Sequence, residues 1–335
     1  MMKQEILRIE KAIAFTKQVF ESELMQQLKL TKVSAPIAVL SGTGINDDLN
    51  GYERTVDFPI KQLKDKKAVV VNSLAKWKRI RLQELEVEED HGIVTDMRAL
   101  RPDEDYSSIH SIYVDQWDWE KRISPHSRSI DFLKSEVRKI YKALKQTELQ
   151  VSSIYDDVQP ILPSDITFIH SEQLLKMYPK LSPKEREQEI VKQYGAVFLI
   201  GIGGKLSNGE PHDGRAPDYD DWSTRSDEGF TGLNGDILVW HPVLQDSFEI
   251  SSMGIRVDKK ALINQLDEKG AFGRKTLFFH KLLLEDKLPE SIGGGIGQSR
   301  VCMFMLRKRH IGEVQVGIWD ESIKTKEKEK GIVLL

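Results

Sequence analysis

The sequence lacks several features that would place it in a secreted or membrane class. It has 335 residues, only one cysteine, Cys302, and no apolar run near the roughly 20 residues that span a bilayer. One cysteine excludes an intramolecular disulfide and a zinc site built on several thiolates. The N-terminus begins an amphipathic pattern and shows no continuous apolar segment. We therefore expect a cytoplasmic protein without signal peptide or membrane anchor.

An excess of charge of one sign is also missing. The chain has 49 basic and 52 acidic residues, so its formal net charge is -3. No global positive field exists to hold a polyanion, which disfavours nucleic acid as a partner. With 39% apolar residues the chain can bury a large core, and its length allows one large domain or two smaller ones.

Common nucleotide, metal and hydrolase motifs are absent. Closely spaced glycines follow Ile200, but the third glycine of G-x-G-x-x-G would fall at Leu206, and the phosphate loop also fails there. None of the eight histidines has the i, i+4 spacing of a helical zinc site. No G-x-S-x-G pentapeptide occurs. These absences argue against dinucleotide-binding, P-loop, zinc and serine hydrolase chemistry.

Hydrophobic periodicity predicts the main elements. Apolar residues spaced by three, four and seven indicate a long helix from Ile6 to Leu28 and another from Ile130 to Leu144. Ser182 and Glu185 form a capping box with Pro183 at the first helical position, so a helix should start there. We expect strands at Ala68–Val71, Ser111–Glu120, Ala196–Ile202, Asp236–Trp240, Phe248–Val257 and Val314–Trp319. Without a regular βαβ repeat, this favours an α+β fold with a mainly antiparallel or mixed sheet flanked by helices.

The strand expected at Ser111–Glu120 has two different faces. Successive side chains of a strand alternate between the faces of its sheet. One face would carry Ile112, Val114, Gln116 and Asp118, and the other Tyr113, Asp115, Trp117 and Trp119.

Arg101 ends an expected strand and precedes the proline turn at Pro102. An arginine fixed on a rigid strand can donate two parallel hydrogen bonds to a phosphate, and its planar fork does so better than lysine. The alternative is a surface ion pair with Asp103 or Glu104, which we would favour if the segment stood alone.

A glycine-rich run, Gly293–Gly297, leads through Gln298 and Ser299 to Arg300 and a helix-like apolar segment. Glycines let a flat ring or a phosphate approach the backbone closely, and Arg300 would project from the first helical turn. A flexible hinge is the alternative. Four glycines directly before an arginine and a buried helix favour a binding site.

Acidic residues recur in the second half of the chain, at Asp218, Asp220, Asp221, Asp236 and Glu249. Carboxylates that converge near triphosphate oxygens suit Mg²⁺, which needs only a few of them and keeps several waters. Each acid could instead form a turn or an ion pair, and we favour that interpretation for Asp218 and Asp221. Glu249 is harder to dismiss because it lies inside an expected strand.

The order of these features resembles the core of class II aminoacyl-tRNA synthetases. It consists of an arginine at a strand end, then acids on a later strand, and then a glycine-rich strand that enters a helix with arginine at its start. Longer runs resemble one family, the ammonia-dependent asparagine synthetases. They are Asn72–Arg79, Ala99–Asp105, His110–Ser111, Tyr113–Glu120, Arg215–Ser223, Leu233–Trp240 and Gly293–Arg300. The match spans nearly the whole chain.

This resemblance implies a class II synthetase-like catalytic core, a single domain over residues 1–335, and a homodimer. It implies a relative of aspartyl- and asparaginyl-tRNA synthetases without an anticodon-binding domain. The implied reaction joins L-aspartate and ammonia to give L-asparagine through a β-aspartyl-adenylate, with release of AMP and pyrophosphate. ATP is then a substrate, Mg²⁺ the cofactor, and the partners are these small molecules.

The resemblance also implies roles for individual residues. Arg101 would hold the α-phosphate and Arg300 the adenine and γ-phosphate. The expected catalytic residues are Asp47, Arg101, Gln116 and Arg300. The expected ATP-binding residues are Arg101, His110, Asp220, Asp236, Glu249, Gly295 and Arg300, and Asp236 and Glu249 would also hold the metal. The expected residues of the amino-acid pocket are Asp47, Ser73, Ala75, Lys78, Gln116, Asp118, Ser251, Ser252, Arg256 and Gly293. By the same resemblance, the strand face with Gln116 and Asp118 would meet the substrate, so Tyr113, Trp117 and Trp119 should pack beneath it. Whether Asp47 or Asp118 binds the α-ammonium or the incoming ammonia stays open.

Free ammonia is the expected nitrogen donor. Glutamine-dependent enzymes release ammonia with a nucleophilic cysteine, often at the mature N-terminus, whereas position 2 here is methionine. Cys302 lies in an apolar helix, where burial is expected. Two alternatives remain: a synthetase paralogue that makes an α-carboxyl adenylate for transfer to RNA, and a catalytically inactive binding module. The intact set of Arg101, Asp236, Glu249 and Arg300 argues against the second.

Overall fold

The computed structural model describes residues 2–46 and 54–335 and is built on an eight-stranded sheet in the order β1-β5-β6-β11-β10-β9-β8-β7. The strands are β1 (Leu30–Lys32), β5 (Gly92–Leu100), β6 (Tyr113–Arg122), β11 (Ser291–Gly297), β10 (Asp246–Ile255), β9 (Asn234–His241), β8 (Ala196–Ile200) and β7 (Thr167–His170). Pairing is antiparallel from β5 through β8, whereas β1 pairs in parallel with β5 and β7 with β8. The predicted mainly antiparallel sheet is confirmed, and its two edges make it mixed.

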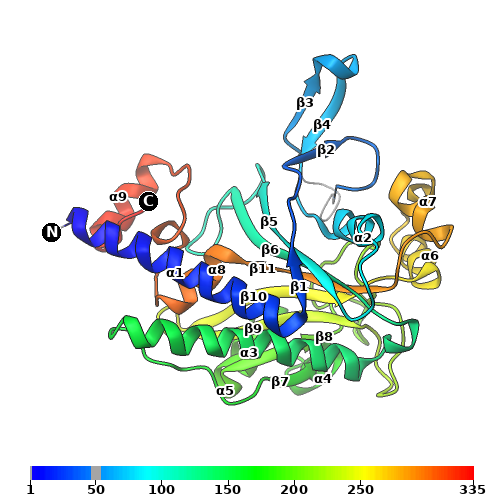
Figure 1. The fold of residues 1–335 in the computed structure, drawn as a ribbon. Coiled ribbons are helices and arrows are strands. Elements are labelled where there is room, and N and C mark those ends of the chain that lie inside the picture. Colours follow the sequence, from blue (N-terminus) through cyan, green and yellow to red (C-terminus); the bar gives the residue numbers. More distant parts are fainter. Residues whose placement is uncertain (1, 47–53) are drawn as a thin grey trace.

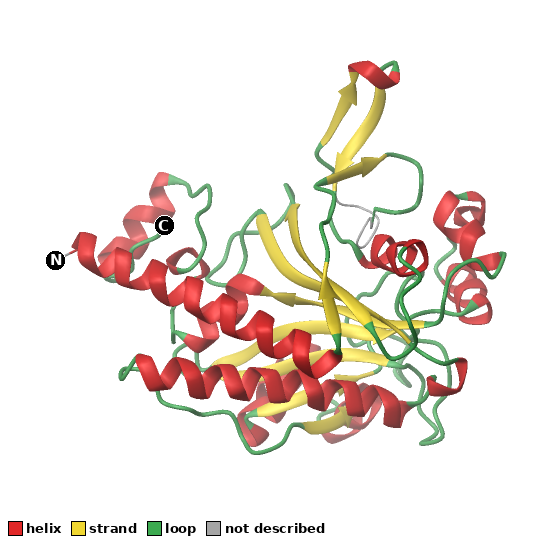
Figure 2. Ribbon diagram, viewed as in Figure 1, coloured by secondary structure: helices red, strands yellow, loops and turns green. Residues whose placement is uncertain are grey.

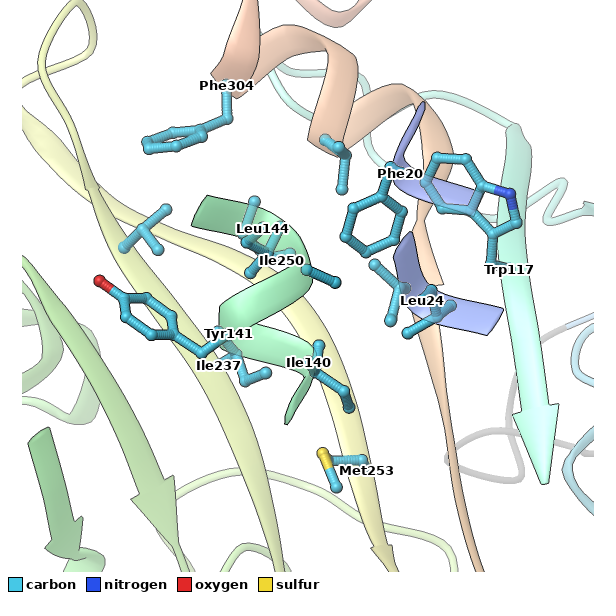
Figure 3. Packing of buried hydrophobic residues seen from close by; sticks show 14 of the residues in the cluster. Phe20, Leu24, Trp117, Ile140, Tyr141, Leu144, Ile237, Ile250, Met253 and Phe304 are labelled. Carbon is cyan, nitrogen blue, oxygen red and sulfur yellow. The ribbon is translucent and has the colours of Figure 1, made fainter. Parts of the chain in front are cut away.

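One face of the sheet is covered by the helices α1 (Met2–Leu28), α3 (Ile130–Ile154) and α8 (Gln298–Met305). Figures 1 and 2 show α1 and α3 lying side by side across this face. The apolar stripes of the helices meet the tryptophans of β6, and Phe20, Trp117 and Trp119 are fully or almost fully buried. Figure 3 shows Phe20 and Leu24 beside Trp117 in this core. The two long helices and the inward direction of Trp117 and Trp119 are therefore as predicted.

The remaining elements lie around the sheet. A small second sheet has the order β2-β4-β3, from β2 (Ala38–Leu40), β4 (Lys66–Val70) and β3 (Asp57–Ile60), and projects from the body (Figure 1). Helix α2 (Ala75–Glu84) packs on β6 and β11, and α5 (Pro183–Tyr194) packs on β9 and β10. The other helices are α4 (Ser171–Met177), α6 (Lys259–Glu268), α7 (Phe278–Leu284) and α9 (Glu321–Glu329), and η1 (Lys61–Leu63), η2 (Pro125–Ser127), η3 (Phe272–Thr276) and η4 (Ile311–Glu313) are single 3-10 turns. Among the described helices, none is both long and apolar enough to cross a bilayer.

The segment Val314–Trp319 is not a strand, so that prediction is wrong. It follows the turn η4 as irregular chain, and Val316 and Ile318 are 69% and 73% exposed. The central strands of the sheet already have neighbours on both sides, which leaves no place for another one there. Buried side-chain contacts hold the segment instead, because Gln315 donates to Ser299 Oγ at 3.0 Å.

Candidate functional site

A cavity of about 520 Å³ lies over the face of β6, β10 and β11 that the helix layer leaves uncovered. Most residues that the sequence assigns to the site line this cavity, although they come from five separate stretches of chain. They are Ser73, Ala75, Lys78, Arg101, His110, Gln116, Asp118, Asp220, Glu249, Ser252, Arg256, Gly295 and Arg300.

The alternation of β6 directs Gln116 and Asp118 to the cavity while Trp117 and Trp119 enter the core. Tyr113 departs from the prediction that it packs beneath the site. It is the first residue of β6, lies outside the apolar cluster, and borders the cavity half-buried. Asp115 borders the cavity as well and accepts hydrogen bonds from Lys17 Nζ at 2.8 Å and Ser299 N at 3.0 Å.

A β-bulge in β10 decides which of its residues face the cavity. The register of β10 against β9 shifts between Glu249 and Ser251, and a bulge turns the following side chains to the other face. Glu249 and Ser252 therefore line the cavity, three positions apart. Ser251, which the sequence places on the wall, lies behind it and donates to Gly295 O at 3.0 Å.

Two further predicted residues, Gly293 and Asp236, do not line the cavity. Gly293 lies beneath the carboxylate of Glu120, because a Cβ there would be 2.0 Å from Glu120 Oε2. Asp236 lies just behind the wall, on β9 opposite Ser252. Asp47 falls outside the described residues.

Gly295 on β11 is the point where the backbone comes closest to polar side chains. A Cβ at Gly295 would lie 2.4 Å from Gln116 Oε1 and 2.8 Å from Asp118 Oδ1, which real Cβ atoms essentially never do. Glycine is therefore required there for Gln116 and Asp118 to lie flat over β11. The glycine-rich run is a close packing surface and part of a rigid strand, which contradicts the flexible-hinge alternative.

At one end of the cavity, Lys78 reaches over from α2. Its Nζ donates to Gly294 O at 2.9 Å and lies 3.4 Å from Asp118 Oδ2. Burial lowers the pKa of Lys78 from its ordinary value, and the nearby Asp118 carboxylate opposes that shift. The start of α2 is fixed by Ser73, whose Oγ accepts the Ala75 N–H at 3.1 Å.

Arg101 stands at the other end, directly after β5. Among the residues that the structure describes, its guanidinium makes only long contacts, 3.4 Å from Nη2 to Asn72 O and 3.9 Å from Nη1 to Glu104. Within residues 2–46 and 54–335, its buried Nε has no hydrogen-bond partner. The alternative interpretation, a surface ion pair with Asp103, does not hold, because Asp103 binds Arg54. Arg101 is thus held loosely and has donors to spare for an anion.

Arg300 lies in the first turn of α8, as predicted, and is fixed from two sides. Its Nη1 donates to Glu249 O at 3.1 Å, and its Nη2 donates to His110 Nε2 at 3.0 Å. Because Nε2 accepts, the His110 proton is on Nδ1, which lies 2.9 Å from Ser107 Oγ. A neutral histidine therefore orients the arginine.

The imidazole of His110 is expected to stay neutral through the physiological range. Burial, followed by the Arg300 charge, lowers the pKa of His110 to about 4. This shift disfavours the charged form, so the folded state loses stability as pH falls from about 6.5 toward 4. An NMR titration, with the resonance assigned by His110→Gln, should find no protonation above pH 5. A midpoint near 6.5 would contradict the hydrogen-bond arrangement given above.

Near Glu249, behind the wall of the cavity, acidic and basic side chains alternate. Arg215 Nη2 lies 2.6 Å from Asp236 Oδ1, and its Nε lies 3.5 Å from Asp220 Oδ2. Burial, opposed by Arg215 and reinforced by Glu249, raises the pKa of Asp236 to about 6. Asp236 and Glu249 therefore repel each other, and a positive charge between them would be favourable.

Sequence reasoning missed two buried residues, Arg215 and Glu120. Arg215 lines the cavity but lies in an irregular loop, where no periodicity indicates its direction. Glu120 shares a strand face with Gln116 and Asp118, so the same alternation extended by two residues was the available signal. Its partner, Arg256, is 136 positions away in the chain.

Asp218, Asp221 and Cys302 have the structural roles that the sequence analysis favoured. Asp218 is buried against Lys76 at 3.1 Å and His280 at 3.0 Å, and Asp221 pairs with Arg128 at 2.5 Å. Asp218 ties its loop to α2 and α7, and Asp221 ties the same loop to the segment before α3, outside the cavity. The thiol of Cys302 is fully buried, which raises its pKa to about 12 and makes it unreactive.

Comparison with known proteins gives consistent matches along nearly the whole chain. A family model described as aspartate-ammonia ligase matches residues 7–331. An aspartate–ammonia ligase of Parabacteroides distasonis is 57% identical over 326 residues, which are 97% of this chain and 94% of the relative. One from Clostridium perfringens is 52% identical, with 97% and 94% covered.

Solved structures share the fold at low identity. An asparaginyl-tRNA synthetase of Pyrococcus horikoshii, in complex with asparaginyl-adenylate, has a TM-score of 0.68 and 14% identity over 92% of this chain and 68% of its own. An asparaginyl-tRNA synthetase of Entamoeba histolytica has a TM-score of 0.67 and 11% identity, with 93% and 67% covered.

Proposed function

The chain belongs to the aspartate–ammonia ligase family, whose members are ATP-dependent enzymes of asparagine synthesis, and we propose that it works through a β-aspartyl-adenylate. In the first step the side-chain carboxylate of L-aspartate attacks the α-phosphorus of ATP, and pyrophosphate leaves. In the second step ammonia attacks the acyl carbon, the bond to AMP breaks, and L-asparagine forms.

One observation carries this proposal: basic side chains line the cavity in two separate groups. Arg101 and Arg300 both lie near His110, and Lys78 and Arg256 both lie near Glu120. Both reactants are anionic, so their approach requires positive charge on both sides of the reacting atoms. Arg101, with its unused donors, is the proposed ligand of the α-phosphate, and Arg300 the ligand of the adenine and γ-phosphate.

The amino-acid end also fits a zwitterion. Lys78 and Arg256 suit carboxylates, whereas Asp118 or Asp47 would hold the α-ammonium or the ammonia. Gln116, Ser252 and the start of α2 at Ser73 complete the proposed pocket.

Asp236 and Glu249 fit the Mg²⁺ that a nucleotide reaction of this kind uses. Glu249 adds to the effect of burial in raising the pKa of Asp236, so a divalent cation near both carboxylates would relieve their repulsion. In residues 2–46 and 54–335, no group of three or more histidine, cysteine or acidic side chains is placed to hold a metal. A magnesium ion held mainly by phosphates and water needs only one or two carboxylates. When bound, it would neutralise charge on the phosphates.

The nitrogen donor in this proposal is free ammonia. Glutamine hydrolysis by the usual route needs a reactive thiol. The one cysteine is deeply buried with a raised pKa, so it does not supply that nucleophile. Assembly as a homodimer and a cytoplasmic location remain predictions from the sequence.

The assay that tests this proposal separates it from the alternatives. Incubation with L-aspartate, ATP, Mg²⁺ and ammonium should yield asparagine, AMP and pyrophosphate in equal amounts. Replacement of ammonium by hydroxylamine should trap the β-aspartyl hydroxamate. ADP and phosphate as products would contradict the adenylate, and an α-hydroxamate would support a synthetase paralogue. No turnover by folded protein would indicate a binding module.

A further inference from the structure

Arg256 is clamped between two buried carboxylates at the amino-acid end of the cavity. Its Nε lies 3.0 Å from Glu120 Oε1 and 3.1 Å from Oε2, and its Nη2 lies 2.8 Å from Oε2. Its Nη1 donates to Asp220 Oδ1. Glu120 is completely buried and does not line the cavity, whereas Arg256 does.

The clamp leaves part of the guanidinium free. A guanidinium has five N–H donors in fixed directions. Glu120 takes the Nε–H and one on Nη2, and Asp220 takes one on Nη1. Within the described part of the chain, one donor on each terminal nitrogen therefore remains without a partner. Two donors on adjacent nitrogens match the two oxygens of one carboxylate.

Two further features of the fold serve the position of Glu120. Ser291 Oγ donates to Glu120 Oε1 at 2.7 Å. At Gly293, a Cβ would lie 2.0 Å from Glu120 Oε2 and 2.6 Å from Arg256 Nη2, so only glycine leaves room for the clamp. The strands β6 and β11 thus hold Glu120 from below and from the side.

We propose that Glu120 is a positioning residue that aims the free edge of Arg256 at a carboxylate of aspartate. This inference rests on the proposed function and deepens it, because it names the groups that fix substrate recognition. Without Glu120, Arg256 would be held by Asp220 alone and could turn its donors away from the substrate. Aspartate binding should then weaken, while ATP binding at Arg101 and Arg300 should not change.

Two independent variants test this. Glu120→Gln removes the charge that holds Arg256, and Gly293→Ala displaces the carboxylate from its place. Each should raise the KM for aspartate about 10- to 100-fold, the range expected when a charged hydrogen-bond partner is lost, and leave the KM for ATP within about twofold. Because both act on one clamp, the double variant should be no worse than the more affected single one.

Glu136→Gln is the matched control. Glu136 is equally buried and paired with a lysine, Lys121, at 3.2 Å, but it lies on α3, away from the cavity. Its loss should lower the melting temperature and leave the KM for aspartate unchanged. Ser291→Ala is a milder probe, expected to raise that KM about 2- to 5-fold, and serves if Glu120→Gln does not fold.

Two results in folded Gly293→Ala and Ser291→Ala protein would overturn the positioning role. One is an equal change in the KM values for aspartate and ATP, and the other is no change in either value. Calorimetric titration of aspartate into wild-type and variant protein, in the presence of a non-hydrolysable ATP analogue, measures the same contact without turnover. The wild-type protein could bind aspartate more tightly than the variants and yet form no asparagine. The tighter binding would support the role of Glu120, and the absence of asparagine would overturn the proposed function.

Discussion

Replacement of Arg101 by alanine is expected to abolish aspartate-dependent release of pyrophosphate and to leave the fold intact. In the proposed reaction, charge develops at the α-phosphorus when the carboxylate attacks, and loss of one donor aimed at such charge costs about 100- to 1000-fold in rate. The fold should tolerate the change because the contacts of Arg101 with the described residues are only those at 3.4 and 3.9 Å. Pyrophosphate release and the melting temperature are the two measurements.

Arg98→Ala is the control for this experiment. Arg98 lies on β5, three residues before Arg101, and is exposed outside the cavity. Its loss should therefore leave both turnover and the melting temperature nearly unchanged. Undiminished turnover by Arg101→Ala would show that another residue binds the α-phosphate. A large fall in melting temperature would show that Arg101 has a structural role.

Asp236→Asn should inactivate the enzyme and yet stabilise it. The pKa of Asp236 is raised to about 6, above its ordinary value of 3.8. Between pH 3.8 and about 6 the folded chain binds more protons than the unfolded chain, so the stability of the fold decreases as pH rises through this range. Above about pH 6 Asp236 is ionised in both states, and the loss of stability is complete. The variant has no charge at position 236, so its free energy of unfolding at pH 8 should be roughly 1–3 kcal/mol larger than that of the wild type.

Urea unfolding of both proteins at pH 8 and pH 5 checks this prediction. The gain should be clear at pH 8 and should shrink at pH 5, where Asp236 is already largely protonated. Turnover should fall about 100-fold or more if Asp236 helps to hold the nucleotide and its metal ion. A variant that is less stable at pH 8, or one that retains turnover, would contradict this description of Asp236.

Local sequence signals predicted the elements of the fold well where capping and periodicity agree. The helix at Pro183 starts with the capping box of Ser182 and Glu185, as predicted. The segment Val314–Trp319 has the alternation of a strand but pairs with no strand of the described sheets, and only the tertiary arrangement decides that. Pattern alone cannot show which strands find partners.

The same distinction holds for the site. Arg101 and Arg300 were predictable because each has a local context, a strand end and a helix start. The direction of Ser251 was not, since it depends on a bulge that no residue type announces. The contacts between Arg256 and Glu120, and between Arg300 and His110, join residues 136 and 190 positions apart, so they follow from the fold and not from any motif.

The burial of Cys302 has a practical consequence for experiments on this protein. Because maleimide cannot reach the thiol of Cys302, a single cysteine introduced at the surface can be labelled specifically in the natural chain. Lys64, at the exposed tip between β3 and β4, stands on the projecting small sheet (Figure 1). A fluorophore attached there would report on movement of that sheet without competing labels and without any change to the core.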